Sequence, residues 1–291
     1  MGVIVVGVDG SDGAASALRW AAAEGRIRRW PVKAVLAWGF LDQHHTIAGE
    51  RFDPGYSPDD AKEALDAYVD AAVGATEAAS MERHIISDLP ARGLIEAASG
   101  AELLLVGARG LGGFRGLLLG SVSQRCLHEA RCPVAVIRSD EAEQDPDAPQ
   151  RVVVGVDRSE PARRALEWAA AEAVARHAVL HVVHAWQPPF VGGFPITGTS
   201  IDYSVFEDAA AQVMTTTLDE VDLTGLAHPV ERSVVCLGAA SALLEAGRRA
   251  QVTVVGAQGR GAVGRMLLGS VSHQVTLHAT NPVVVVPSHS D

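Results

Sequence analysis

The chain is one sequence written twice, and this duplication constrains the fold more than any other feature. Residues 5–11, VVGVDGS, recur as VVGVDRS at residues 153–159. The glycine-rich stretch GARGLGGFRGLLLGS at residues 107–121 recurs as GAQGRGAVGRMLLGS at residues 256–270, and eight of the fifteen positions are identical. A repeat this long is a duplicated domain rather than a solenoid unit. Both halves are therefore expected to share one fold.

A short acidic segment separates the two copies. Residues 139–150, SDEAEQDPDAPQ, contain five acids and two prolines and almost no apolar side chain. This composition is typical of an extended, solvated linker. We therefore expect a first domain at residues 1–138, the linker at 139–150 and a second domain at residues 151–291.

Each half alternates strand-like and helix-like patterns. Residues 3–8 form a run of β-branched residues that is typical of a strand buried on both faces, and the apolar spacing at residues 14–22 predicts an amphipathic helix. A single helix is predicted over residues 59–80. Four tryptophans recur at matched positions and predict core packing: Trp20, Trp38, Trp168 and Trp186. The alternation predicts an α/β fold of two tandem Rossmann-like domains, each a parallel sheet with helices on both faces.

Composition argues against several classes of binding partner and of cellular location. The formal net charge is -11, which argues against nucleic acid and anionic membranes as partners, because both favour a basic surface. Apolar stretches are only as long as strands, and the first residues read as a strand rather than a signal peptide. We therefore expect a cytoplasmic protein, with three cysteines (Cys126, Cys132 and Cys236) that act as buried hydrophobic side chains.

The glycines that the two halves share follow the pattern G-x2-G-x9-G-S. The first glycine ends a strand, and the second can take a positive φ that turns successive N–H groups inward around an anion. The last glycine and the serine open a helix, whose first N–H groups are unpaired and whose dipole is positive there. The pattern predicts two phosphate-binding sites, made of Gly107, Gly110, Gly120 and Ser121 in the first half and of Gly256, Gly259, Gly269 and Ser270 in the second.

The chain resembles a tandem universal stress protein of the ATP-binding type. The resemblance is carried by a first strand that ends in Asp, by the glycine pattern and by a proline before the last strand, in both halves. It implies a five-stranded parallel sheet of order 3-2-1-4-5 in each domain, with ATP bound across the strand ends. It also implies that the two domains pair through their last strands. We further expect a homodimer of the whole chain, although the sequence leaves the oligomeric state open.

The resemblance implies two matching sets of nucleotide contacts. Beyond the glycines and serines, each set has an aspartate beside the nucleoside, an alanine whose main chain meets adenine, and a valine that offers the next backbone N–H. These residues are Asp9, Ala37 and Val122 in the first half and Asp157, Ala185 and Val271 in the second. Two differences between the halves, Gly10 against Arg158 and Arg109 against Gln258, predict sites of unequal affinity.

Other interpretations of the same residues stay open at this point. The aspartates can cap the turns that follow them, and the glycines can form a flexible loop. The chain can be an ATP-binding regulator of stress or growth state, a slow ATP hydrolase, or a dimerisation module without working pockets. We name no catalytic residue, because no base, lysine or acid pair accompanies the glycine pattern. Mg²⁺ is expected only as a companion of ATP, and His44-His45 lacks the partners of a metal site.

Overall fold

The first half of the chain folds as its pattern predicts. The computed structural model describes residues 2–38, 57–110, 118–138, 150–188, 190–191, 194–195, 203–259 and 268–288. The elements of the first half are β1 (Ile4–Gly7), α1 (Asp12–Arg28), β2 (Val32–Trp38), α2 (Pro58–Ala72), α3 (Ala75–Ser80), β3 (Glu82–Ser87), α4 (Pro90–Ala97), β4 (Leu103–Gly107), α5 (Ser121–Glu129) and β5 (Val134–Ile137).

The second half repeats this order with one addition. Its elements are β6 (Arg151–Gly155), α6 (Glu160–Arg176), β7 (Val179–Trp186), α7 (Ser204–Asp219), β10 (Glu231–Cys236), α8 (Ala239–Gly247), β11 (Val252–Gly256), α9 (Ser270–His278) and β12 (Val283–Val286). The addition is a short antiparallel pair after β7, formed by β8 (Phe190–Val191) and β9 (Phe194–Pro195).

The described chain forms two units. One unit holds Met1–Glu141 together with Pro282–Asp291, and the other holds Ala142–Asn281. In the first unit the strand order is β12-β5-β4-β1-β2-β3, and all neighbouring strands run parallel except β12, which pairs antiparallel with β5. In the second unit the order is β10-β7-β6-β11, again parallel. The predicted α/β class and the pairing of the two last strands are therefore confirmed.

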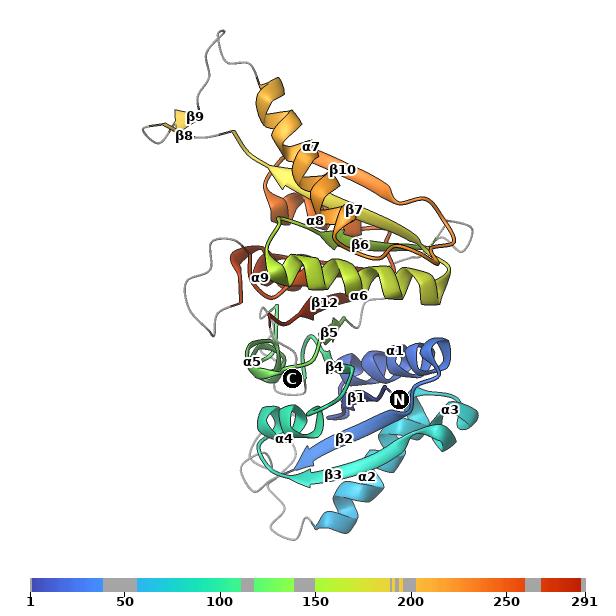
Figure 1. Cartoon of the computed structure of the whole chain (residues 1–291). Helices are drawn as coiled ribbons and strands as arrows, with labels where there is room; N and C mark the ends of the chain where they lie inside the picture. The colour runs from blue at the N-terminus through green and yellow to red at the C-terminus, as the bar shows by residue number, and fades with distance from the viewer. Residues whose placement is uncertain are drawn as a thin grey trace. The chain divides into compact units, whose positions relative to one another are not determined.

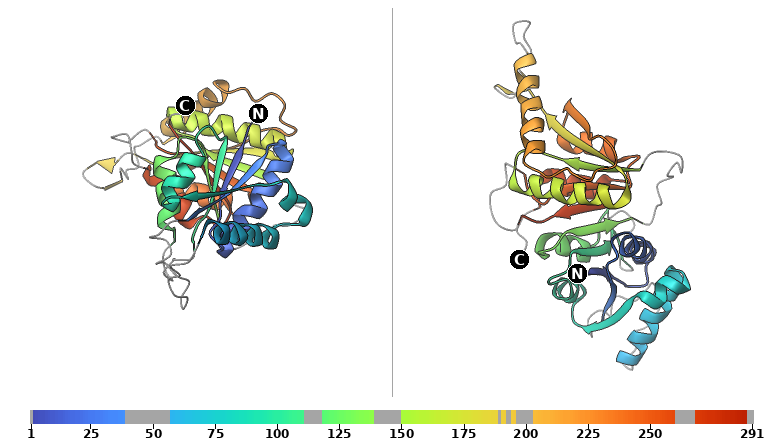
Figure 2. Two further views of the ribbon diagram at one scale, coloured as in Figure 1. Left: turned by 90° about the horizontal axis from the view of Figure 1, so that it is seen from below. Right: turned by 45° about the vertical axis from the view of Figure 1, so that its right-hand side comes forward.

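Helices cover both faces of each sheet, as Figures 1 and 2 show. In the first unit α1 packs with α2 on one face and α4 packs with α5 on the other. The buried strand residues of β1, β4 and β6 are 0–3% exposed, as expected for a parallel sheet between two helix layers. This burial explains why those strands read as continuous apolar runs. The domain limits 1–138 and 151–291 remain a proposal, since residues 139–149 lie outside the described ranges.

Two expectations about local structure were wrong. The helix predicted over residues 59–80 is two helices, because Val73 takes an extended backbone and Gly74 then starts α3 as its N-cap. The four recurring tryptophans are half-buried rather than core residues. Trp186, for example, stacks on Phe206 with ring centroids 6.3 Å apart.

Candidate nucleotide sites

Both candidate sites lie where the strand order reverses. In the first unit the chain runs from β1 outward to β2 and β3 and then returns to β4, so β1 and β4 are neighbours that lead to opposite edges. The pair β6 and β11 has the same role in the second unit. Open parallel sheets bind ligands at the carboxyl ends of such strands. Asp9 and Asp157 follow the first strand of each pair, and the glycine stretches follow the second.

The two aspartates accept the same backbone hydrogen bond in their turns. Oδ1 of Asp9 accepts a hydrogen bond from the Ser11 backbone N–H at 3.0 Å, and Oδ1 of Asp157 accepts one from the Ser159 N–H at the same distance. Each serine is then the N-cap of the next helix, α1 or α6. Capping the turn therefore occupies one carboxylate oxygen in each repeat. The second oxygen faces the glycine loop, since a Cβ added to Gly259 would lie 2.7 Å from Asp157 Oδ2.

The glycine stretch closes on itself in both repeats. The N–H of Gly120 donates to the carbonyl of Ala108 at 2.7 Å, and the N–H of Gly269 donates to the carbonyl of Ala257 at 2.7 Å. These bonds bring the start of α5 or α9 against the end of β4 or β11. Neither N-cap, Gly120 or Gly269, supplies a side-chain cap. The first turn of each helix therefore presents N–H groups that no capping side chain covers.

All seven residues predicted for the second repeat line one cavity of about 560 Å³. They are Asp157, Ala185, Gly256, Gly259, Gly269, Ser270 and Val271. The same cavity has an apolar wall that includes Val183, Leu243, Val255 and Leu268. Its volume lies in the range of small-molecule sites, and its lining combines glycine and serine main chain with apolar side chains.

The first repeat places its predicted residues in the same relation. A Cβ added to Gly110 would press on Asp9 Oδ2, and one added to Gly120 would lie 3.8 Å from the Gly110 nitrogen. Ser121 is exposed, Val122 and Gly107 are half-buried, and Ala37 lies half-buried in β2 beside Gly93 of α4. The aspartate, the loop glycine and the helix start therefore converge here as well.

The sequence interpretation missed one residue in each repeat that shapes the site. Ser123 Oγ donates to the Gly107 carbonyl at 2.6 Å, and Ser272 Oγ donates to the Gly256 carbonyl at 2.5 Å. Both serines are buried, and their bonds tie the helix that follows the loop to the end of the strand that precedes it. The signal was present, because the stretch after the loop reads GSVS in both halves.

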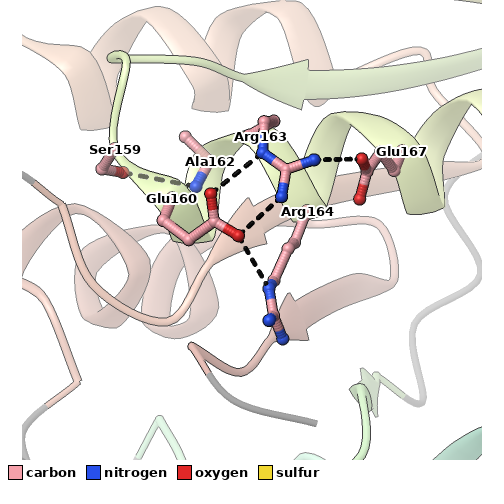
Figure 3. Close-up of polar contacts among 6 residues, drawn as sticks. All are labelled: Ser159, Glu160, Ala162, Arg163, Arg164 and Glu167. Carbon is pink, nitrogen blue, oxygen red and sulfur yellow. Dashed lines mark hydrogen bonds and ion pairs between the residues drawn. The ribbon is translucent and has the colours of Figure 1, made fainter. Parts of the chain in front are cut away.

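A cluster of ion pairs covers the start of α6, next to the second site (Figure 3). Glu160 accepts hydrogen bonds from Arg163 at 2.6 and 2.9 Å and from Arg164 at 3.1 Å. Arg163 also bonds Glu167. The Arg163 hydrogen bonds, and then those of Arg164, lower the pKa of the Glu160 carboxyl to about 2. The first repeat has Asp12, Ala15 and Ser16 at the positions of Glu160, Arg163 and Arg164, so this cluster belongs to the second repeat alone.

The three cysteines do not share one environment. Cys126 and Cys132 are buried, and burial raises the pKa of their thiols to about 12 and about 11. Cys236, at the end of β10, is exposed. The prediction of three buried cysteines is therefore wrong for Cys236, because it ends a strand at the margin of the sheet.

The described ranges lack the features of two further classes of site. No group of three or more His, Cys, Asp or Glu side chains there could hold a metal ion. The His44-His45 pair lies outside those ranges. Of the helices in the described part of the chain, none is long and apolar enough to cross a membrane.

Fold and site together define a class of protein: two doubly wound parallel-sheet domains, each with an aspartate turn and a glycine loop at its switch point. The family model of the universal stress proteins matches residues 1–138 and 149–287. The chain belongs to the universal stress protein family.

Relatives of the full length support this assignment. Universal stress protein Rv2005c of Mycobacterium tuberculosis is 33% identical over 296 residues, which cover 99% of this chain and 97% of the relative. Universal stress protein Rv2623 of the same organism is 31% identical, with 97% and 95% covered. Among solved structures, a universal stress protein from Archaeoglobus fulgidus matches with a TM-score of 0.61 at 20% identity, over 98% of this chain and 96% of that one. The duplicated domain arrangement is thus shared along the whole length.

Proposed function

We propose that the chain is an ATP-binding universal stress protein with one nucleotide site in each repeat. The observation that carries the proposal is the cavity in the second repeat. It is lined by all seven residues that the glycine pattern and the resemblance predict for that repeat. On this proposal the chain regulates stress or growth state through its nucleotide, and it works in the cytoplasm as a homodimer. Mg²⁺ would enter only with ATP.

The residues that line the cavity fit a nucleotide. Beside the loop, a Cβ on Gly269 would lie 3.3 Å from Gln258 Cα and 3.5 Å from the Gly259 nitrogen, so a side chain there would take up space in the notch between loop and helix. α9 starts with N–H groups that no side chain caps, and its exposed first residue, Ser270, lines the cavity. Donors of this kind bind phosphate without a lysine.

The apolar part of the lining suits a nucleoside. On this proposal Asp157, whose Oδ1 accepts a hydrogen bond from the Ser159 N–H, contacts a ribose hydroxyl or a base amine. The apolar wall, Val183 and Leu243 among it, can cover the face of a purine ring. The main chain of Ala185 would meet the edge of adenine. When bound, ATP would supply the triphosphate, and the protein would respond to whether that triphosphate is present.

The proposal is tested by calorimetry with ATP together with steady-state turnover. Tight binding with phosphate release near background supports a regulator. Repeated turnover that Asp9→Ala and Asp157→Ala abolish would show a slow ATP hydrolase instead. No binding of ATP, at protein concentrations well above the micromolar range, would leave a dimerisation module and would overturn the proposal.

A further inference from the structure

The start of α9 is joined to the end of β11 by two hydrogen bonds. The Ser272 hydroxyl donates to the carbonyl of Gly256 at 2.5 Å, and the Gly269 N–H donates to the carbonyl of Ala257 at 2.7 Å. Gly256 and Ala257 are consecutive, so the helix start is held at two neighbouring points of the chain. Ser272 is 4% exposed, and a hydrogen bond in the protein interior is electrostatically stronger than one in water. The two bonds therefore fix the first turn of the helix relative to the strand.

The first repeat has the same pair of bonds. The Ser123 hydroxyl donates to the Gly107 carbonyl at 2.6 Å, and the Gly120 N–H donates to the Ala108 carbonyl at 2.7 Å. Ser123 is 3% exposed. The two glycine stretches agree at only eight of fifteen positions, yet the junction of strand and helix is closed in the same way. A closure that both sequences share indicates a common task at this junction.

The side chain of Ser272 anchors a residue whose main chain belongs to the cavity. Gly269 is the N-cap of α9 and supplies no side-chain cap, so the N–H groups of residues 270–272 have no acceptor within their own helix. All three residues line the cavity. A serine in such a turn can bond to the main chain of its own helix. Ser272 bonds instead to β11, and it thereby holds the first turn of α9 beside the glycine loop.

The strand end that Ser272 holds has little room to move. A Cβ added to Gly256 would lie 2.6 Å from the carbonyl carbon of Pro161 and 2.7 Å from its oxygen. In the first repeat, a Cβ added to Gly107 would lie 2.7 Å from the carbonyl carbon of Gly13. Pro161 and Gly13 belong to the first turns of α6 and α1, so each strand end packs directly against the helix start of the same repeat. A hydrogen bond to this point therefore limits the movement of the first turn that the serine belongs to.

We propose, on the basis of the proposed function, that Ser272 and Ser123 are positioning residues for the phosphate tail of the nucleotide. Neither hydroxyl contacts the ligand in this proposal, because each donates to a strand carbonyl. Each serine acts through the N–H groups of its helix start, which it holds in place before the ligand arrives. Donors that are already in place bind an anion more tightly, because little ordering is then needed on binding.

The test compares ATP with adenosine, which has the same nucleoside but no phosphate. Gly120→Leu fills the first cradle, so that the second site is measured alone, and circular dichroism verifies the fold. In this background Ser272→Ala should weaken ATP binding about tenfold, the effect of one hydrogen bond to a charged group. The affinity for adenosine should stay unchanged, because the nucleoside does not use these N–H groups. Calorimetry measures both ligands.

Thr253→Val is the matched control for stability. Thr253 lies in β11, is 1% exposed, and accepts a hydrogen bond from Nδ2 of the buried Asn281 at 3.0 Å. Its loss leaves a buried polar group without this partner, as Ser272→Ala does at the Gly256 carbonyl. Both variants should lower the urea midpoint of unfolding. Thr253→Val, however, should leave the affinity for ATP unchanged, because the first turn of α9 keeps its anchor.

The outcomes separate this inference from the proposed function. Ser123→Ala in the Gly269→Leu background should weaken ATP binding at the first site in the same way. If the wild type binds ATP but Ser272→Ala keeps its affinity, or loses affinity for ATP and adenosine equally, the serine is only structural. The inference is then wrong and the proposed function stands. The same follows if Thr253→Val weakens ATP binding as much as Ser272→Ala. If the wild type binds no ATP, the proposed function itself fails.

Discussion

Replacing the last glycine of each loop by alanine tests the cradle most sharply. Gly120 has φ of −76° and Gly269 has φ of −62°, values that any residue adopts. A Cβ at 120 would come no closer than 3.5 Å to the described atoms around it, and one at 269 no closer than 3.3 Å. Both alanine variants should therefore fold. The expected loss in free energy of unfolding is about 1 kcal/mol or less, the cost of alanine at an N-cap.

The effect on ATP binding should be much larger. The added methyl group would stand 3.5 Å from the Gly259 nitrogen in the second repeat and 3.8 Å from the Gly110 nitrogen in the first. These are the amides that we propose for the phosphate tail. Hydrogen bonds to a charged group contribute about 1.5–3 kcal/mol each. Losing one or two of them weakens ATP binding at that repeat by at least about tenfold.

Gly74→Ala supplies the matched control. Gly74 is also an N-cap glycine, with φ of −66°, and the nearest atom to an added Cβ is the end of the flexible Glu77 side chain. Calorimetry with ATP and urea unfolding of the three variants separate binding from stability. Gly120→Ala and Gly269→Ala should each weaken one of two sites, and Gly74→Ala neither. Wild-type affinity in all three variants would refute the cradle.

Three further predictions concern stability and reactivity. Glu24 is fully buried beside Arg28, so Glu24→Ala should lower the free energy of unfolding by about 3–5 kcal/mol in urea titration, and a loss below about 1 kcal/mol would contradict the pairing. The lowered pKa of Glu160 contributes stability that is present above pH 4.5 and lost as pH falls towards about 2. The difference in free energy of unfolding between wild type and Glu160→Gln should therefore shrink as pH falls through this window, and it should be constant at higher pH. In native protein at pH 8, iodoacetamide should alkylate only the exposed Cys236, because burial and the raised thiol pKa values protect Cys126 and Cys132. Alkylation of all three cysteines without unfolding would contradict the burial of those two thiols.

Much of the fold was predictable because the signals were local and were written twice. The β-branched runs and the apolar spacing of the helices determine the order of elements. The pairing of Val134–Ile137 with Val283–Val286 was expected from the resemblance, and the structure has it. The break at Val73-Gly74 was missed because residues 59–80 contain no proline and Gly74 is their one glycine.

The site was predictable only as far as the two copies agree. Glycines, aspartates and serines at equal spacing identified the loop, and the convergence around one cavity in the second repeat fits that prediction. The contact between Gly10 and Tyr68 was out of reach, since it joins a turn to a helix that lies some sixty residues further along the chain.

The number of ATP molecules bound per chain tests the central claim most directly. Native mass spectrometry of the purified full-length chain, titrated with ATP, should show two successive additions, with the first and second steps differing in affinity. Gly120→Leu and Gly269→Leu should each remove one addition. A chain that stays at its unliganded mass throughout the titration, with its fold intact by circular dichroism, would contradict the account.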